Sequence, residues 1–251
     1  MIIKRSFLSG LRLMRDEVSH FNEYPFCIPA IKNLRHLKFH PKVTFFVGEN
    51  GSGKSTLLEA IAVKYGFNAE GGSKNLKFAT EETHSALSEY IRLERNAYPT
   101  DGFFLRAESF YNVATQIDHL GVNFGYGKKS LHAQSHGEAF LSLLCNRLQG
   151  DGLYIFDEPE AALSPQRQLS VLTLIHRLVY HNSQLIIATH SPILLAYPDA
   201  SIYQFSENGI SPIDYTDTEN YQVTKNFLNR HEKMTEILLA EESKDLKEKE
   251  R

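Results

Sequence analysis

This sequence contains few cysteines, no long apolar run and no large excess of charge of one sign. Its 251 residues contain two cysteines, Cys27 and Cys145. Both lie among apolar neighbours, so we expect packing roles in a reducing compartment rather than a disulfide framework or a zinc site. No run of roughly eighteen apolar residues is present, so no transmembrane helix is expected. The net charge of −3 provides no global field for nucleic acid or anionic membranes, although it does not exclude a local basic patch.

Targeting signals are also missing from the beginning of the sequence. The first seven residues contain neither the apolar core nor the cleavage site of a signal peptide. We therefore expect a cytoplasmic protein that does not insert into membranes. A chain of this length with ordinary composition predicts one α/β domain with a smaller inserted lobe. No internal repeat and no long heptad run are present.

The most informative segment is rich in glycine. Residues 48–56 read GENGSGKST and fit the phosphate-binding pattern G-x-x-x-x-G-K-[ST] at every fixed position. The apolar residues 43–47 predict a buried strand before this loop, and residues 57–62 predict a helix after it. A chance glycine-rich turn is the alternative, and the flanking strand and helix argue against it.

This order of elements suits a polyphosphate. Glycines let the backbone curl so that successive N–H groups face an anion, and the helix adds its positive dipole end. Lys54 would reach the β- and γ-phosphates, and the Ser55 hydroxyl would ligate Mg²⁺. The residues assigned to nucleotide binding are Gly48, Glu49, Asn50, Gly51, Ser52, Gly53, Lys54, Ser55 and Thr56.

Buried strands alternate with helices along the rest of the chain, which predicts a mainly parallel sheet. Residues 26–31 are expected to join an N-terminal antiparallel β portion, and residues 85–94 fit either a strand or a short helix. Further strands are expected at residues 103–105, 153–156 and 185–188, with a hairpin at 202–205 and 210–213. Helical potential extends from residue 107 to about 129, and residues 121–127 predict a glycine-rich loop. Further helices are expected at residues 137–148, from Pro165 onward with Ser164 as the N-cap, and at 219–240. Residues 241–251 are mostly charged and predict a solvated or frayed helix end.

Three chemically capable residues follow apolar strands directly. Gly48, Asp157 and His190 should therefore gather at the carboxyl edge of the sheet, where ligands bind in such folds. Asp157 could hold Mg²⁺ opposite Ser55, which lies on the phosphate loop. Glu158, which would point the other way if the strand continued, could orient or deprotonate the attacking water. A solvated strand end is the alternative for both carboxylates.

His190 and the segment around residue 136 have weaker local support. The imidazole could hydrogen-bond the γ-phosphate or the attacking water, although a lone histidine is commonly structural. Ser135 and Gly137 precede a predicted helix whose apolar face comprises Ala139, Phe140, Leu143, Leu144 and Leu148. They form either a second anion site or an ordinary helix cap with Glu138 nearby, and local physics favours the cap.

Together these segments resemble the ABC-type ATPase superfamily, which includes the heads of chromosome-maintenance proteins and stand-alone AAA-type ATPases. The segment at 135–139, SHGEA, resembles the signature motif; 153–158, LYIFDE, resembles the Walker B strand with its catalytic glutamate. Residues 162–165 and 188–191 resemble the D-loop and the switch-histidine segment. These five ordered motifs, counting the phosphate loop, cover about residues 25–205.

The resemblance implies a P-loop fold with ATP and Mg²⁺ as cofactors. It also implies an ATP-dependent homodimer, in which Ser135 and Gly137 bind the γ-phosphate held by a second copy. Two positions depart from the family pattern. Arg106-Ala107-Glu108 stands where a Q-loop glutamine is expected, the nearest glutamine being Gln116, and His136 and Glu138 replace the usual signature residues. The span from Lys54 to Ser135 is too short for the coiled coil of the chromosome-maintenance relatives.

We therefore expect a single ABC-type domain. Its parts are an N-terminal β portion with the phosphate-loop core at residues 1–105, a helical signature lobe at 106–150, a second core half at 151–230, and a charged C-terminal helix or tail at 231–251. The expected activity is ATP hydrolysis with Glu158, His190 and Lys54 as catalytic residues, switching an interaction with an effector protein or nucleic acid. A low-turnover regulatory module of a nuclease, toxin or defence system is the alternative, as is a transporter ATPase subunit. A small-molecule kinase ranks last.

Overall fold

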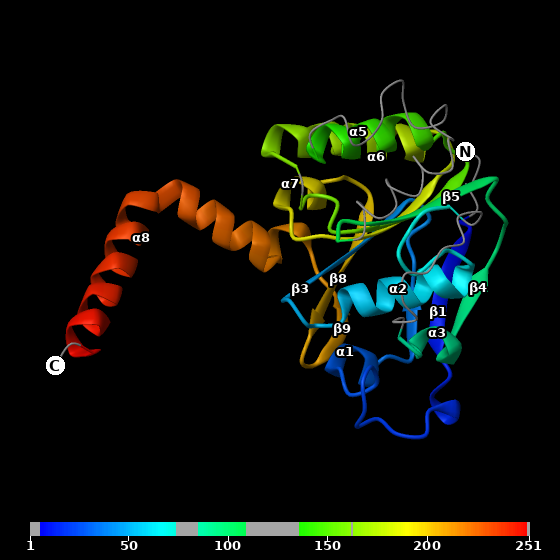
Figure 1. The fold of residues 1–251 in the computed structure, drawn as a ribbon, viewed down its shortest axis with the longest axis horizontal. Helices are drawn as coiled ribbons and strands as arrows, with labels where there is room; N and C mark the ends of the chain where they lie inside the picture. Colours follow the sequence, from blue (N-terminus) through cyan, green and yellow to red (C-terminus); the bar gives the residue numbers. More distant parts are fainter. Residues whose placement is uncertain (1–5, 74–84, 109–135, 162, 250–251) are drawn as a thin grey trace.

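The computed structural model describes residues 6–73, 85–108, 136–161 and 163–249 (Figure 1). These residues are built around a six-stranded sheet in the order β5-β6-β7-β3-β8-β9. The first five of these strands run parallel, and β9 pairs antiparallel with β8. In that order the strands are β5 (Asp101–Arg106), β6 (Gly152–Asp157), β7 (Gln184–Ala188), β3 (Val43–Gly48), β8 (Ala200–Ser206) and β9 (Gly209–Pro212). The predicted mainly parallel sheet and C-terminal hairpin are confirmed.

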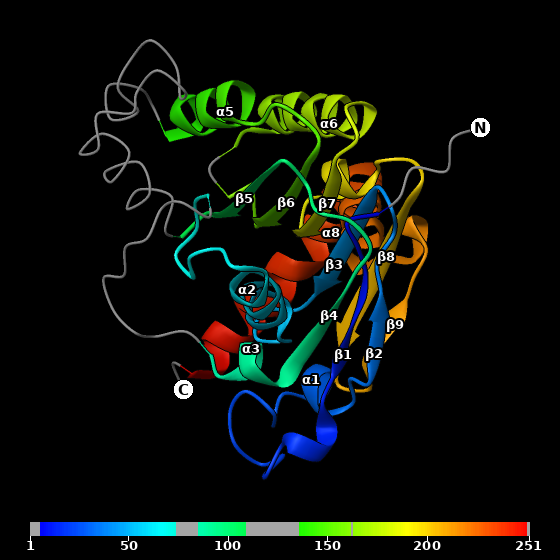
Figure 2. The same cartoon turned by 90° about the vertical axis from the view of Figure 1, so that its right-hand side faces the viewer.

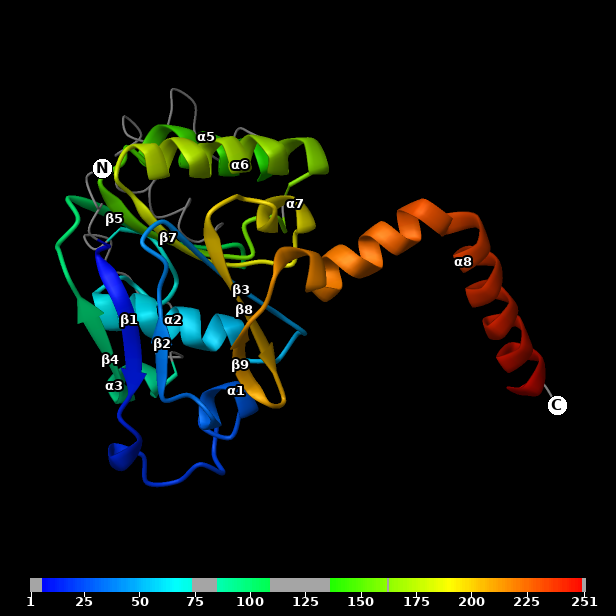
Figure 3. The same cartoon turned by 180° about the vertical axis from the view of Figure 1, so that it is seen from behind.

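A smaller antiparallel sheet stands beside this core. Its central strand β1 (Leu8–Leu13) pairs with β2 (His36–Lys38) on one side and β4 (Ile91–Arg95) on the other. Figure 3 shows the three strands side by side. The expected antiparallel N-terminal portion is therefore present.

Helices cover both faces of the large sheet (Figure 2). The helix α2 (Lys54–Tyr65) packs on one face, and α5 (His136–Arg147) and α6 (Pro165–Tyr180) lie on the other. Successive side chains of a strand point to opposite faces, and β3 shows this directly because Phe45 and Phe46 belong to two different apolar clusters. Both rings are fully buried, which stabilises the fold by about 1.5–3 kcal/mol each.

The segments that sequence patterns left uncertain contain short helices. Residues 85–94 hold both expected alternatives, since α3 (Leu87–Tyr90) leads directly into β4. The expectation of a strand at residues 26–31 was wrong, because the chain forms α1 (Pro29–Lys32) there. Pro29 occupies the first turn of α1, where its fixed φ and missing N–H suit a helix start.

The expected packing role of the cysteines was also wrong, since Cys27 and Cys145 are exposed. Phe140 and Leu144 of α5 and Leu148 just after it are buried, and the exposed Cys145 falls on another face of the helix. Apolar neighbours in sequence therefore did not indicate apolar neighbours in space.

The helix α6 begins as expected, with Ser164 at the N-cap position and Pro165 at the first turn. Among the described contacts, however, the Ser164 side chain makes no capping hydrogen bond. Ile175 and Val179 of this helix are buried, while Leu169 is 47% exposed.

The C-terminal part ends in the helix α8 (Glu219–Lys249), which projects away from the body of the protein (Figure 1). Its backbone leaves helical geometry at Arg230 (φ −141°, ψ 31°), which produces a kink. No helix in the described ranges is both long enough and apolar enough to cross a membrane. The remaining short elements are the 3-10 turns Arg15–Glu17 and Tyr215–Asp217 and the helix α7 (Pro192–Leu195). The predicted helix at 107–129, apart from its first two residues, and the loop at 121–127 lie outside the described residues.

Candidate active site

The carboxyl ends of three neighbouring strands form the candidate site. β3 ends at Gly48, β6 ends at Asp157, and β7 ends at Ala188, two residues before His190. These strands are adjacent in the sheet, and Asp157 pairs in register with Ala188. The structure thus places the phosphate loop, the paired carboxylates and His190 at one edge of the sheet.

The phosphate loop has the curled backbone that an anion cradle requires. Gly48, Gly51 and Gly53 have φ values of 145°, 79° and 98°, a region that residues with a Cβ rarely adopt. The loop leads directly into the N-terminus of α2, where free N–H groups and the helix dipole favour a phosphate. Ser52 Oγ is buried and has no hydrogen-bond partner among the described residues, so it is available to a bound group.

Gly48 and Gly51 allow a matched test of this backbone. A Cβ added at Gly48 would lie 2.4 Å from the Phe205 carbonyl oxygen, whereas one at Gly51 would meet nothing within 4 Å. We expect Gly48→Ala to lower the free energy of unfolding by about 3 kcal/mol or more, because strain and overpacking add. Gly51→Ala should cost about 1–2 kcal/mol from the positive φ alone. Urea denaturation of both variants measures the difference, and equal losses would contradict the assigned steric role of Gly48.

Lys54 is the first residue of α2, and its side chain folds back onto the backbone of the phosphate loop. Its Nζ donates to the carbonyl oxygens of Gly48 (2.7 Å) and Glu49 (2.8 Å), and the residue is buried. Burial lowers the pKa of this ammonium from its ordinary value, and the carboxylates of Glu158 and Asp157 oppose that shift. The cation is therefore held at the mouth of the phosphate loop by groups that a phosphate can replace.

A hydroxyl and a carboxylate meet beside the loop. Ser55 Oγ donates to Asp157 Oδ1 over 3.0 Å. Burial raises the pKa of Asp157 to about 6, partly offset by the charge of Arg106 and the Ser55 hydrogen bond. These two hard oxygen ligands fit Mg²⁺, which usually takes one or two protein ligands and completes its shell with phosphates and water. Among the described residues no group of three or more His, Cys, Asp or Glu side chains could hold a metal alone.

Glu158 and His190 form a contact across the ends of β6 and β7. Glu158 Oε1 lies 3.5 Å from His190 Nε2, and both side chains are partly exposed. The strand ends at Asp157, and Glu158 has a φ of 50°, so the expected continued alternation does not apply. A positive φ at a residue with a Cβ stores strain, which is common at functional sites.

The sequence analysis did not identify Glu160, whose carboxylate binds the backbone of His190. Its Oε1 accepts the backbone N–H of His190 over 2.5 Å, and burial raises the pKa of this carboxyl from its ordinary value. The only hint in the sequence was that a further acidic residue follows Glu158 by two positions. Glu160 thereby fixes the backbone from which the imidazole projects.

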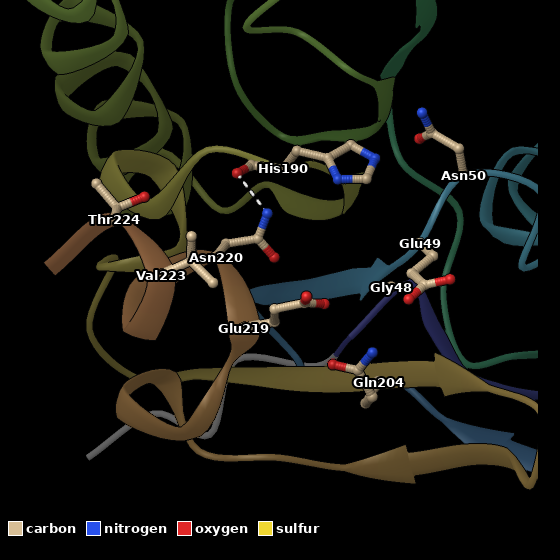
Figure 4. A pocket seen from close by; sticks show the side chains of 9 residues that line it. All are labelled: Gly48, Glu49, Asn50, His190, Gln204, Glu219, Asn220, Val223 and Thr224. Carbon is tan, nitrogen blue, oxygen red and sulfur yellow. Dashed lines mark hydrogen bonds between the residues drawn. The ribbon is translucent and has the colours of Figure 1, made fainter. Parts of the chain in front are cut away.

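A pocket of about 390 Å³ opens beside the phosphate loop (Figure 4). Glu49 and Asn50 line one side, α8 lines the other, and His190 lies between them. Asn220 Nδ2, from the first turn of α8, donates to the His190 carbonyl oxygen over 2.9 Å. The sequence predicted this helix but gave no signal of its place in the site. The other lining residues are Gly48, Gln204, Glu219, Val223 and Thr224.

Thr56 and Gly137 are the remaining predicted residues that the structure describes. Thr56 lies on α2, where its Oγ1 is 3.4 Å from the Tyr24 hydroxyl. Gly137 is buried in the first turn of α5, on the sheet face opposite α2 (Figure 2). Ser135 lies outside the described residues. Gly137, a described residue of the signature segment, is not among the residues that line the pocket beside the phosphate loop.

Two family models match the sequence in succession. Residues 19–123 match the model described as "AAA domain", and residues 138–196 match "AAA domain, putative AbiEii toxin, Type IV TA system". The first match contains the phosphate loop, and the second contains Asp157, Glu158 and His190.

Curated relatives extend over most of this chain. The ribose import ATP-binding protein RbsA of Bacillus cereus is 24% identical over 204 residues, covering 70% of this chain and 40% of the relative. The energy-coupling factor transporter ATP-binding protein EcfA2 of Methanospirillum hungatei is 25% identical over 243 residues, covering 89% of this chain and 60% of the relative. The chain thus spans less than two thirds of the length of either relative.

Solved structures are similar at lower sequence identity. The cbiO1 protein of Clostridium perfringens, part of the ABC transporter complex cbiONQ, is 17% identical with a TM-score of 0.46, covering 93% of this chain and 99% of that one. The SMC head domain of Thermotoga maritima is also 17% identical, with a TM-score of 0.41 and coverage of 71% and 93%. Both halves of the candidate site therefore lie in sequence that matches AAA-domain models, and both curated relatives are named ATP-binding proteins.

Proposed function

We propose that this protein binds ATP together with Mg²⁺ and hydrolyses it to ADP and phosphate. The observation that carries the proposal is the 3.0 Å contact between Ser55 Oγ and Asp157 Oδ1, directly beside the phosphate loop. A phosphate loop alone would support nucleotide binding. The paired metal ligands, followed at once by Glu158 and its contact with His190, support hydrolysis.

Each residue has a distinct role in this proposal. Lys54 exchanges its contacts with loop carbonyls for contacts with the β- and γ-phosphates. Ser55 and Asp157 would hold the metal ion, which would supply positive charge beside the phosphate oxygens. Glu158 orients the attacking water and accepts its proton, while His190 stabilises the γ-phosphate from the neighbouring strand end.

We further propose that the site is completed by a second copy of the chain. The helix α5, which carries Gly137, lies on the sheet face opposite α2, and Gly137 does not line the pocket beside the phosphate loop of its own chain. This arrangement supports a role for the signature segment at the nucleotide of a partner. ATP would then be sandwiched between the phosphate loop of one copy and Ser135 and Gly137 of the other. Hydrolysis would release the contact, so the ATP cycle would switch association.

Steady-state turnover separates this proposal from a low-turnover regulatory module. We expect the wild-type protein to hydrolyse ATP at least about 10²-fold faster than Lys54→Ala, because the variant loses the cation that binds the phosphates. Phosphate release at saturating ATP and Mg²⁺ measures both rates. A wild-type rate equal to the Lys54→Ala background, with ATP shown to bind the wild type, would favour the regulatory module.

Two observations bear on the partner. The second family model names a toxin of a type IV toxin–antitoxin system, which supports an effector protein, and nucleic acid is an alternative partner. The names of the relatives RbsA and EcfA2 support a second candidate function, the ATPase subunit of a transporter. Proteins and nucleic acids that copurify with ATP-loaded Glu158→Gln protein distinguish these cases, since only a transporter subunit should bring an integral membrane protein.

A further inference from the structure

Arg106 occupies the end of β5, where the family resemblance led us to expect a glutamine. Its side chain is 20% exposed and lies between α2 and the end of β6. The Nη1 atom donates to Glu59 Oε2 over 2.7 Å and to the Ala69 carbonyl oxygen over 3.3 Å. The Nε atom lies 3.8 Å from Asp157 Oδ2, and Arg106 and Asp157 are register partners in the parallel β5–β6 pair.

This guanidinium connects both protein ligands of the proposed metal site. Asp157 receives the Ser55 hydroxyl on Oδ1 and faces Arg106 with Oδ2. Ser55 and Glu59 are one helical turn apart on α2, so they lie on the same side of that helix. Glu59 is itself fixed, because its Oε1 accepts the backbone N–H of Ser85 over 3.1 Å. Arg106 therefore ties the helix that carries Ser55 to the strand that carries Asp157.

A glutamine could not make the same set of contacts. Arginine carries five donors in a rigid fork and stays charged, whereas glutamine is neutral and has two amide donors. Here one cation faces the two largely buried carboxylates of Glu59 and Asp157, and its Nη2 also lies 3.5 Å from the exposed carboxylate of Glu108. Nε is buried, makes no hydrogen bond within the described residues, and is the atom nearest Asp157. This separation exceeds direct hydrogen-bond length, so Arg106 acts on Asp157 through its charge.

We propose that Arg106 is a positioning residue of the metal site, holding the Asp157 carboxylate and α2 so that Oδ1 and the Ser55 hydroxyl present one pair of ligands to Mg²⁺. This inference rests on the proposed function, because it assigns Arg106 to the metal site of that reaction. It predicts that Arg106 controls the Mg²⁺ requirement of the protein and not only its stability.

The test uses variants that separate positioning from simple charge pairing. Arg106→Gln leaves Glu59 buried without its cation, which could destabilise the fold. The double variant Arg106→Gln/Glu59→Gln removes both charges together, and Arg106→Lys keeps the charge but loses the fork. Arg147→Gln is the matched control, because Arg147 forms a comparable ion pair with Asp101 at the opposite end of β5. The side chains of Arg147 and Arg106 are nearly equally exposed, at 21% and 20% respectively.

The readout is the Mg²⁺ concentration that half-maximally strengthens ADP binding, measured by calorimetry without turnover. We expect this midpoint to rise about tenfold in the double variant, to rise less in Arg106→Lys, and to stay unchanged in Arg147→Gln. An unchanged midpoint in both the double variant and Arg106→Lys would overturn the inference, because Arg106 would then only neutralise Glu59. A lower midpoint would overturn it too, since Arg106 would act by repelling the metal. If wild-type ADP binding shows no Mg²⁺ dependence, it is the proposed function that fails.

Discussion

Replacing Glu158 by glutamine is expected to lower kcat for ATP hydrolysis by about 10²–10⁴-fold while ATP still binds. Glutamine retains the size of the side chain and a hydrogen-bonding group opposite His190, whose Nε2 lies 3.5 Å from Glu158 Oε1. It cannot accept a proton from the attacking water. Phosphate release measured beside direct ATP binding separates the two effects.

The same variant tests the proposed sandwich, because an ATP complex that is not hydrolysed should persist. We expect Glu158→Gln to form a dimer with ATP in size-exclusion chromatography with light scattering, and to return to monomer with ADP. Glu207→Gln, an exposed carboxylate in the turn between β8 and β9, is the matched control and should behave as wild type. A Glu158→Gln protein that stays monomeric with ATP demonstrably bound would contradict the sandwich. An unchanged kcat would contradict the role of Glu158.

Replacing Asp157 by asparagine should remove Mg²⁺-dependent hydrolysis and, without nucleotide and metal, make the protein more stable above pH 6. Burial raises the pKa of this carboxyl from 3.8 to about 6 in the folded protein. The folded state therefore binds the proton more tightly than the unfolded state, and stability is lost as the pH rises through that interval. A shift of about two units corresponds to at most about 3 kcal/mol, so we expect a gain of about 1–3 kcal/mol at pH 7.5 and almost none at pH 4.

Urea denaturation of both proteins at the two pH values measures this gain. Asp199→Asn provides a control of opposite sign, since Lys42 lowers the pKa of Asp199 and its ionised form favours folding. That control should not gain stability at pH 7.5. A gain for Asp157→Asn of the same size at pH 4 and pH 7.5 would mean that burial of the charge is not its cause. A gain at pH 7.5 that is absent at pH 4 would show that the buried Asp157 carboxylate is kept at a cost in stability.

The core of the fold was predictable because its strands are apolar on both faces. β3, β6 and β7 are buried along their whole length, so each appears in the sequence as a largely apolar run that ends at a polar motif. Since these strands are parallel neighbours, the motifs had to meet at one edge. The phosphate loop, Asp157 and His190 could thus be brought together from pattern alone.

Contacts between distant segments were not predictable in this way. Asn220 reaches the His190 carbonyl oxygen from α8, thirty residues further along the chain, and nothing in the local pattern of either residue indicates the other. The ion pair between Arg106 and Glu59 spans forty-seven residues in the same way. Pro29 carried a usable helix signal that the apolar pattern of its neighbours obscured. Local patterns therefore located the strand ends, and tertiary contacts decided what surrounds them.

The projecting helix α8 has a hydrodynamic consequence. Its 31 residues correspond to about 46 Å of helix, bent at Arg230 and directed away from the sheet (Figure 1). An arm of this kind increases frictional drag while adding little mass, so a 28.6 kDa monomer should sediment and diffuse more slowly than a sphere of equal mass. A change in the bend at Arg230 would alter the sedimentation coefficient at constant mass. Because α8 begins beside the pocket at the phosphate loop, the frictional ratio with and without ATP reports whether events at that loop reorient this arm.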